Sequence, residues 1–399
     1  MFDIKSDFPV FDDKTLVYLD TCSSSQKPKF VIDGISEHLS KYYANIHRGM
    51  YNLSDFSEDL YDKSKSIIAK NLNVKSSQII YTYNSTYAFN ILSMSLYFSN
   101  ILKNGDKILL SIAEHHSNIV PWLILKDKID IEIDYVNIDK NGDIDLQDFE
   151  QKYDKNVKIV SFTYVSNLTG TIFDLENIGN LLRDDTIFVV DGSQAVPNFP
   201  VDFQKINADF LIFTGHKLMA NTGIGVLVAN KNLLKKMNPC FGGGGNIKDV
   251  SLQSVSFLNG IQAFEAGTPN ISGAISLLKA FEYIESIGGF KKIWEKEQEL
   301  TKYMLDGFLK RSDKIELIGK NNTKNRLGVF SFILKGNFSA IKFGEFMAMK
   351  NICIRCGGHC AHPYLKFMGY LSSCRVSLYV YNNFDDIDKF FDAIDEFIN

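Results

Sequence analysis

Two ionisable residues stand at the ends of apolar runs in the middle of the chain. Lys217 closes the segment 213–217, and Asp191 closes the run 187–191. Burying either charge is costly unless it has a partner or a chemical task. A lysine whose pKa is lowered by burial keeps a neutral amine that can form a Schiff base with a carbonyl compound. The spacing alone therefore indicates either carbonyl chemistry or a Lys–Asp ion pair inside an α/β domain.

Pyridoxal phosphate would satisfy both residues at once. Its protonated ring nitrogen would pair with the carboxylate of Asp191, and its aldehyde would take the amine of Lys217. A helix that starts near Asn84 would add a phosphate site, since Ser85 and Thr86 follow an apolar run and a helix N-terminus attracts anions. An ordinary pair of helix-capping hydroxyls is the alternative.

A short segment near the C-terminus is rich in thiols. Cys353, Cys356 and Cys360 follow one another at a spacing that matches zinc knuckles and iron–sulfur loops poorly. A strand over 352–356 would also point Cys353 and Cys356 to opposite faces. The glycines that precede His359 would present Cys360 on a loop where its thiolate is reactive. We expect a reactive thiol here and no metal site.

Alternating elements explain how these residues could meet. Short apolar runs predict strands over 79–83, 107–112, 131–136, 157–164, 187–190, 210–214 and 225–228. Their alternation with helical patterns indicates an α/β fold with a mostly parallel sheet, covered on both faces. Ligands bind beyond the carboxyl ends of such strands. The residues that fall there are Asn84, His115, Asn167, Asp191 and Lys217.

The pattern changes after residue 270. Helical spacing over 275–284 leads into a charged helical stretch that reaches about residue 311. Strands are expected over 315–319, 329–334, 352–356 and 374–381, before an amphipathic C-terminal helix that buries Ile387, Phe390, Phe391, Ile394 and Phe397. We expect a large domain over 18–290 and a smaller α+β domain over 291–399, on which residues 1–17 pack.

Composition excludes some classes of partner. The chain has 399 residues and a formal charge of −4 without a basic run, so we expect no nucleic-acid partner. No stretch approaches the roughly 18 consecutive apolar residues of a membrane-spanning helix, and the N-terminus does not resemble a signal peptide. We expect a cytoplasmic protein without membrane contact, whose six cysteines are thiols.

Nine short motifs occur in the order in which one enzyme family carries them. They are SQKP at 25–28, ANIHRG at 44–49, EHHSNIVPW at 114–122, SNLTGT at 166–171, DGSQAVP at 191–197, TGHK at 214–217, FEAGTPN at 264–270, GGHCA at 357–361 and SCRVS at 373–377. Through them the chain resembles the class V aminotransferase family of fold-type I pyridoxal-phosphate enzymes. Within that family it is most similar to the SUF-type cysteine desulfurase and selenocysteine lyase branch.

The resemblance implies a role for each matching residue. Lys217 would bind the cofactor and remove the substrate's α-proton, His115 would stack on the ring, and Asp191 would hold the ring nitrogen. The phosphate would be bound by Ser85, Thr86, Thr214 and His216. The ring oxygen would be bound by Asn167 and Gln194. Thr268 would reach the phosphate of the neighbouring subunit. A homodimer follows from the last of these roles.

For the substrate, the resemblance assigns three residues. Cys360 would be the sulfur-accepting nucleophile, Arg375 would clamp the α-carboxylate, and Arg355 would lie near the reacting sulfur. The implied enzyme is a cysteine desulfurase that converts L-cysteine to L-alanine and passes the Cys360 persulfide to an acceptor protein, for iron–sulfur assembly or another thiolation. A selenocysteine lyase, a cysteine sulfinate desulfinase, a class V aminotransferase and a non-catalytic regulator are the alternatives.

Three residues depart from the family pattern. Gly358 stands where histidine is common, Cys356 stands where threonine or alanine is usual, and Cys22 lies in a turn that the family keeps rich in alanine. Gly358 would change the proton chemistry of the loop, and a sulfur exchange between Cys356 and Cys360 is conceivable. Cys22 would alter substrate preference, because its turn borders the substrate.

Overall fold

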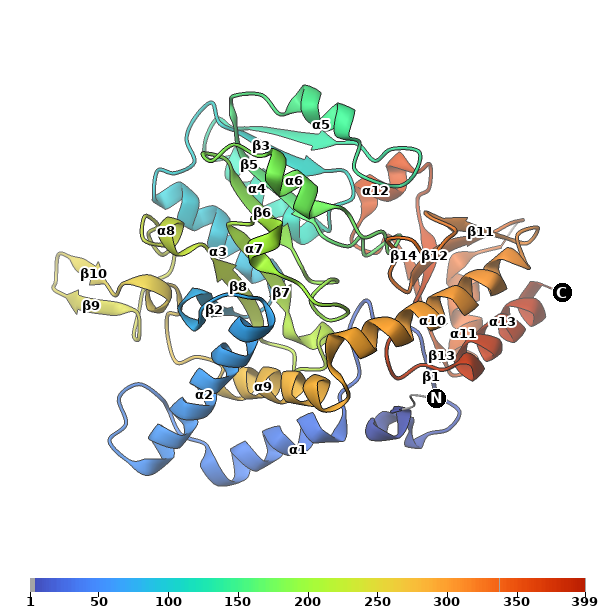
Figure 1. Cartoon of the computed structure of the whole chain (residues 1–399), viewed down its shortest axis with the longest axis horizontal. Coiled ribbons are helices and arrows are strands. Elements are labelled where there is room, and N and C mark those ends of the chain that lie inside the picture. The colour runs from blue at the N-terminus through green and yellow to red at the C-terminus, as the bar shows by residue number, and fades with distance from the viewer. Residues whose placement is uncertain (1–3, 337, 399) are drawn as a thin grey trace.

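A seven-stranded sheet forms the centre of the computed structural model, which describes residues 4–336 and 338–398 (Figure 1). Its strands, in spatial order, are β2 (Ile79–Thr82), β8 (Gly225–Ala229), β7 (Phe210–Thr214), β6 (Ile187–Asp191), β5 (Val157–Thr163), β3 (Lys107–Ser111) and β4 (Glu132–Val136). Strand β8 runs antiparallel to both neighbours, and the other pairings are parallel. The expected α/β fold with a mostly parallel sheet is confirmed.

Helices cover both faces of this sheet because its central strands are apolar on both sides. Along β7, Leu211 and Phe213 belong to one buried core, while Phe210 and Ile212 belong to the other. The first core includes residues of α2 (Asn52–Asn71), α6 (Leu175–Leu181), α7 (Phe203–Ile206) and α9 (Ile271–Ser286). The second includes residues of α3 (Ser85–Phe98), α4 (Val120–Lys126) and α8 (Lys231–Leu234).

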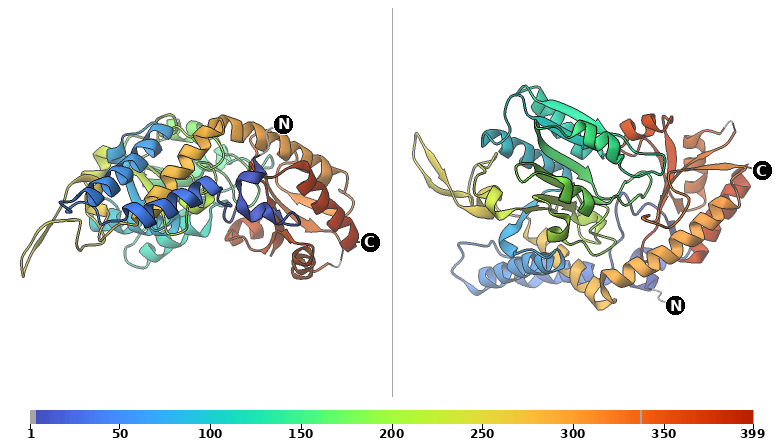
Figure 2. Two further views of the ribbon diagram at one scale, coloured as in Figure 1. Left: turned by 90° about the horizontal axis from the view of Figure 1, so that it is seen from below. Right: turned by 45° about the horizontal axis from the view of Figure 1, so that its top comes forward.

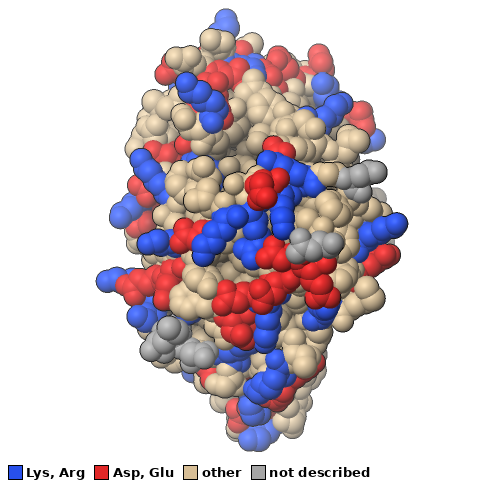
Figure 3. All heavy atoms as spheres, turned by 90° about the vertical axis from the view of Figure 1, so that its right-hand side faces the viewer, with Lys and Arg blue, Asp and Glu red and all other residues tan. Residues whose placement is uncertain are grey.

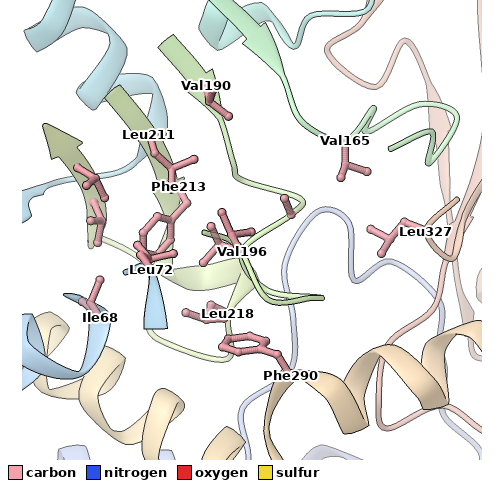
Figure 4. Packing of buried hydrophobic residues seen from close by; sticks show 14 of the residues in the cluster. Ile68, Leu72, Val165, Val190, Val196, Leu211, Phe213, Leu218, Phe290 and Leu327 are labelled. Carbon is pink, nitrogen blue, oxygen red and sulfur yellow. The ribbon is translucent and has the colours of Figure 1, made fainter. Parts of the chain in front are cut away.

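The first core also fixes the turn that carries Lys217. The residues that flank this turn along the chain, Phe213 and Leu218, are fully buried. Figure 4 shows their side chains among Leu72, Val196 and other apolar residues of the same core. Because its neighbours are anchored in this way, the turn has little freedom to move.

A second, antiparallel sheet lies beside the first. Its strands, in order, are β11 (Ile315–Ile318), β12 (Val329–Leu334), β15 (Ser373–Ser377) and β14 (Arg355–Gly357). A third core, which includes Phe308, Phe332 and Phe390, joins this sheet to α10 (Gly289–Leu309), α11 (Ala340–Met349) and α13 (Phe384–Ile398). The remaining helices are α1 (Lys29–Glu37), α5 (Leu146–Lys152) and α12 (His362–Phe367).

Two strand predictions in this region were wrong in extent. The strand expected over 352–356 is broken, because β13 (Ile352–Cys353) pairs with β1 (Val17–Tyr18), whereas β14 pairs with β15. The strand expected over 374–381 ends at Ser377. Its partner β12 begins at Val329, directly opposite Ser377, so no strand remains for the following residues to pair with.

The N-terminal segment runs beside the second sheet (Figure 2). It contains the short 3₁₀ helices Lys5–Asp7 and Pro9–Asp12 before β1. Phe8 and Phe11 pack against Tyr381, and Lys5 forms an ion pair with Asp386 of α13. Residues 1–3 of the segment that was expected to pack here lie outside the described residues.

Two surface features complete the fold. The hairpin of β9 (Ile247–Val250) and β10 (Val255–Phe257) projects away from the body of the molecule (Figure 2). On the face shown in Figure 3, basic side chains are interspersed with acidic ones, and ion pairs such as Arg311–Asp395 and Lys350–Glu396 bind α13 to its neighbours. None of the described helices is both long and apolar enough to span a membrane.

Candidate active site

A cavity of about 690 Å³ opens where the carboxyl ends of the parallel strands face β14 and β15. Its lining includes most of the residues that the sequence predicted for the site: Ser85, Thr86, His115, Asn167, Asp191, Gln194, Thr214, His216, Lys217, Arg355, Cys360 and Arg375. Thr268 lines a different cavity, together with Tyr83 and Tyr87. The fold therefore assembles one site from both sheets and leaves Thr268 outside it.

Lys217 and Asp191 approach this cavity from adjacent strands. Lys217 ends the 3₁₀ turn Gly215–Lys217 after β7, and Asp191 is the last residue of β6. Desolvation lowers the pKa of Lys217, although Cys22 and Asp191 favour its charged form. Burial raises the pKa of Asp191, while a hydrogen bond from the Ser193 N–H (2.9 Å) opposes that shift. A lysine in this setting can present a neutral, nucleophilic amine.

Hydroxyl groups gather at the first turn of α3. Asn84 caps this helix by accepting the Tyr87 N–H (2.9 Å). Ser193 Oγ lies 3.0 Å from Ser85 Oγ, and Ser117 Oγ lies 2.6 Å from Thr86 Oγ1. A helix N-terminus surrounded by hydroxyl donors is a site suited to a phosphate group.

Thr214 provides an unsatisfied hydroxyl in the same cavity. The residue is buried, and its Oγ1 has no hydrogen-bond partner among the described residues. A buried hydroxyl without a partner is unfavourable. A bound polar ligand would relieve that cost.

His115 carries a neutral imidazole. Its Nδ1 accepts the Ser117 N–H (3.1 Å), so the ring proton is on Nε2. Burial, together with the positive charge of Lys217, lowers the pKa of His115 to about 3. Burial likewise lowers the pKa of His216 to about 4. A flat, uncharged ring above the site is suited to stacking on an aromatic ligand.

Cys22 contacts the amide side chain of Gln194 and the backbone carbonyl of Asn167. The Gln194 Nε2 donates to the carbonyl oxygen of Cys22 and to its Sγ, both at 2.8 Å. The Asn167 Nδ2 donates to the carbonyl of His359 (2.7 Å). The thiol of Cys22 is therefore part of the site, where the sequence had indicated only that its turn borders the substrate.

Two arginines share a single carboxylate at the rim. Arg355 donates to Asp20 Oδ2 (3.0 Å), and Arg375 lies 3.4 Å from Asp20 Oδ1. Arg375 is 3% exposed, also donates to Ser23 Oγ (2.8 Å), and keeps an Nε without a partner among the described residues. One positive charge remains uncompensated, so this rim favours a second carboxylate, such as that of an amino acid.

Cys360 is exposed at the tip of a strained turn. His359 and Cys360 both have left-handed backbone conformations, with φ of 52° and 53°. Non-glycine residues avoid this region, and strain of this kind gathers at functional sites. Contacts hold the turn, because the buried His359 ring lies 3.0 Å from the carbonyl of Ser373, and the His116 N–H donates to the carbonyl of Cys360 (2.9 Å).

Several residues of the cavity were not expected to contribute side chains, namely Ser117, Ser193, Thr222 and His362. For Ser117 a signal was available, since it lies two residues after His115 and can return a hydrogen bond to it. The thiol of Cys356 lies 3.0 Å from Cys374 Sγ and packs near Gly344 of α11. Its neighbour is thus Cys374, and not the Cys360 considered from the sequence.

The profile of the family Aminotransferase class-V matches residues 17–390. The chain belongs to the class V aminotransferase family. A probable cysteine desulfurase of Pyrococcus abyssi is 35% identical, with 99% of this chain and 97% of that protein aligned. A cysteine desulfurase of Wigglesworthia glossinidia brevipalpis is 37% identical, with 98% and 96% aligned.

Solved structures of class V enzymes share the fold over the whole chain. The apo structure of the cysteine desulfurase of Thermococcus onnurineus superposes with a TM-score of 0.93 at 34% identity, covering 99% of this chain and 97% of that one. The cysteine desulfurase CsdA of Escherichia coli gives a TM-score of 0.90 at 28% identity, covering 98% and 96%. The fold is therefore that of the fold-type I pyridoxal-phosphate enzymes, and the chain is an enzyme of this kind.

Proposed function

We propose that this class V enzyme is a pyridoxal-phosphate-dependent cysteine desulfurase, which converts L-cysteine to L-alanine and leaves a persulfide on Cys360. The observation that carries the proposal is the composition of one cavity. A thiol on an exposed, strained turn faces the same space as the Lys217–Asp191 pair and the carboxylate-seeking Arg375. The relatives described above as cysteine desulfurases support the same conclusion.

The residues present fit the proposed cofactor. The unpartnered Thr214 hydroxyl and the hydroxyl-rich start of α3 would hold the phosphate, with His216 beside them. Asp191 would hold the ring nitrogen, His115 would cover the ring, and Asn167 and Gln194 would meet its oxygen. Bound there, pyridoxal phosphate would accept electrons released at the substrate's α-carbon.

The chain's own groups would carry out the remaining steps. Arg375 orients the substrate through its α-carboxylate, and the Lys217 amine removes the proton from the α-carbon. The Cys360 thiolate attacks the substrate sulfur, so that an S–S bond forms as the C–S bond breaks. Arg355 lies at the rim where this sulfur is handed over, and a sulfur acceptor protein would then collect it.

Selenocysteine and cysteine sulfinate are the competing substrates, because both fit the same carboxylate clamp and lysine. Their leaving groups depart with less help from a thiol. Alanine release from L-cysteine, L-selenocysteine and L-cysteine sulfinate should therefore be compared between the parent enzyme and Cys360→Ala. We expect the variant to lose activity on cysteine selectively. An equal loss on all three substrates would contradict the assigned role of Cys360.

We also propose a cytoplasmic homodimer in which Thr268 reaches the phosphate in the partner's site. Thr268 lies outside the cavity of its own chain, so a role at the phosphate requires a second chain. Exposed apolar residues, including Met50 and Leu252, lie on the N-terminal helical region and the projecting hairpin. Such residues are typical of a surface that another chain covers.

A further inference from the structure

Two stacked imidazoles close the turn that carries Cys360. His116 is the first residue of the 3₁₀ helix His116–Asn118 that follows β3, and His362 is the first residue of α12. Their rings are 5.0 Å apart and inclined by only 18°, and His362 Nδ1 lies 3.1 Å from His116 Nε2. Together with the hydrogen bond from the His116 N–H to the Cys360 carbonyl, this pair ties the turn to the first sheet.

The hydrogen bonds of the pair favour one arrangement of the ring protons. The backbone N–H of His362 donates to His116 Nε2 (3.3 Å), so this nitrogen is an acceptor and carries no proton. The ring contact at the same nitrogen must then receive its proton from His362 Nδ1. In a neutral imidazole the other nitrogen is unprotonated. His362 Nε2 therefore keeps a free lone pair, which makes it a base.

Gly358 makes room for this base. A Cβ atom at residue 358 would lie 2.2 Å from His362 Nε2, well inside contact distance. The imidazole of His362 therefore occupies the volume that a side chain at 358 would fill. His362, Gly358 and Cys360 line the same cavity, so the histidine and the residue that carries the thiol border one space.

We propose that His362 is the acid–base residue for the Cys360 thiol and that His116 is its positioning residue. The role in turnover rests on the proposed function. The proton of the Cys360 thiol passes to His362 Nε2, and the thiolate forms the S–S bond to the substrate sulfur. The electron pair of the broken C–S bond stays with the carbon fragment. That fragment takes up a proton to become alanine while His362 releases its own, so protons balance.

The surroundings of the pair agree with this assignment. Burial, together with the neighbouring His362, lowers the pKa of His116, a shift in the direction of a neutral acceptor. The other ionisable groups that line the cavity from its surrounding elements are Cys22, Tyr83, His115, Asp191, His216, Lys217, Arg355, Cys356, His359 and Arg375. Among them, His115, His216 and His359 also have pKa values lowered by burial, and His359 Nε2 is already engaged with Ser373. His359 Nδ1 is also without a hydrogen-bond partner among the described residues, but that nitrogen is buried. His362 is the histidine whose Nε2 lies where a side chain at residue 358 would stand.

The first test measures thiol reactivity without any substrate. The thiols of the holoenzyme are alkylated with iodoacetamide, and the carbamidomethyl label on Cys360 is followed by peptide mass spectrometry in the parent, His362→Gln and His116→Gln. We expect His362→Gln to slow labelling of Cys360 at pH 7 by roughly tenfold, because the thiolate is the reactive form and the variant lacks the base that receives its proton. At pH 10 the rates should converge, and Cys240 serves as the internal control with an unchanged rate. Equal rates at pH 7 would overturn the proposal.

A relocated imidazole provides the second test. Gly358→His alone should be disruptive, because the new side chain meets His362. The double variant Gly358→His, His362→Ala removes that clash and returns an imidazole to the turn. We expect it to recover most of the neutral-pH labelling rate and of the desulfuration that His362→Ala loses, whereas Gly358→Ala, His362→Ala should recover neither. Recovery by both double variants would show that His362 acts only by packing, and would overturn the proposal.

The two tests separate this inference from the proposed function. The enzyme could fail to act on L-cysteine while His362→Gln still slows the alkylation of Cys360. That result would refute the desulfurase function and support the link between His362 and Cys360. Desulfuration that persists together with unchanged labelling would refute the role of His362 alone.

Discussion

At the scale of single residues, the site contains ionisable groups that are buried or incompletely paired among the described residues. Lys217 and Asp191 have pKa values shifted toward their neutral forms by burial. Arg375 shares one carboxylate with Arg355, and its Nε has no hydrogen-bond partner in the described part of the chain. Unmatched groups of this kind cost stability in the unliganded protein. Their persistence in one cavity indicates that cofactor and substrate supply the missing partners.

The first prediction concerns the clamp. Arg375→Lys keeps a positive charge but loses the planar fork that binds a carboxylate through two hydrogen bonds. Losing one charge-assisted hydrogen bond, worth about 1.5–3 kcal/mol, should raise the KM for L-cysteine by about tenfold or more. The absorption spectrum of the bound cofactor should stay close to that of the parent, which controls for damage to the site. A KM equal to that of the parent would assign Arg375 a structural role.

The second prediction concerns pH and His359. Burial lowers its pKa to about 3, below the unperturbed 6.5, so the unfolded chain binds the proton more readily. The contribution of His359 to the free energy of unfolding is fully present above pH 6.5. It is lost as pH falls toward 3, by about 1.4 kcal/mol for each pH unit. His359→Gln should therefore lose less stability than the parent between pH 6.5 and 5, measured by urea unfolding. Equal losses of stability in the parent and in His359→Gln would contradict the lowered pKa of His359.

At the scale of secondary-structure elements, the sequence predicted best where burial alone decides. The seven strands of the first sheet follow apolar runs and lie within one or two residues of their expected limits. The runs 352–356 and 374–381 were misjudged because their ends depend on which distant strand pairs with them. Contacts such as His116–His362 join segments far apart in the sequence, and no local sequence pattern predicts them.

The third prediction separates helix capping from cofactor binding. Asn84→Ala removes the cap of α3 and should destabilise the protein by about 1 kcal/mol, while also weakening the affinity for pyridoxal phosphate. Asp145→Ala is the matched control, since Asp145 caps α5 by accepting the N–H groups of Gln147 and Asp148. It should cause a similar loss of stability with unchanged cofactor affinity. Equal effects of both variants on cofactor affinity would refute the phosphate role of α3.

At the scale of the whole molecule, the site exists because two sheets meet. The first sheet supplies Lys217 and Asp191, while β15 and the turn after β14 supply Arg375 and Cys360. We propose that the two sheets form separate domains divided near residue 290, with the N-terminal segment bound to the second. The alternation of apolar runs with helical patterns predicted the mostly parallel sheet, but not how the turn with Cys360 is held.

The fourth prediction concerns assembly. If Thr268 serves the site of a second chain, light scattering should give twice the chain mass, and Thr268→Ala should weaken cofactor binding without changing that mass. Mixing Thr268→Ala with Lys217→Ala subunits should yield some dimers with one complete site and partial activity. A monomeric, fully active enzyme would refute the shared site.

The central claim is that one cavity moves sulfur from L-cysteine to Cys360. The most direct test is peptide mass spectrometry of the holoenzyme after one equivalent of L-cysteine, with alanine measured in the same sample. We expect one added sulfur atom on the peptide that contains Cys360, in step with alanine release, and neither product from Cys360→Ala. Alanine released by Cys360→Ala at the parent's rate, or sulfur found on another cysteine, would contradict the central claim.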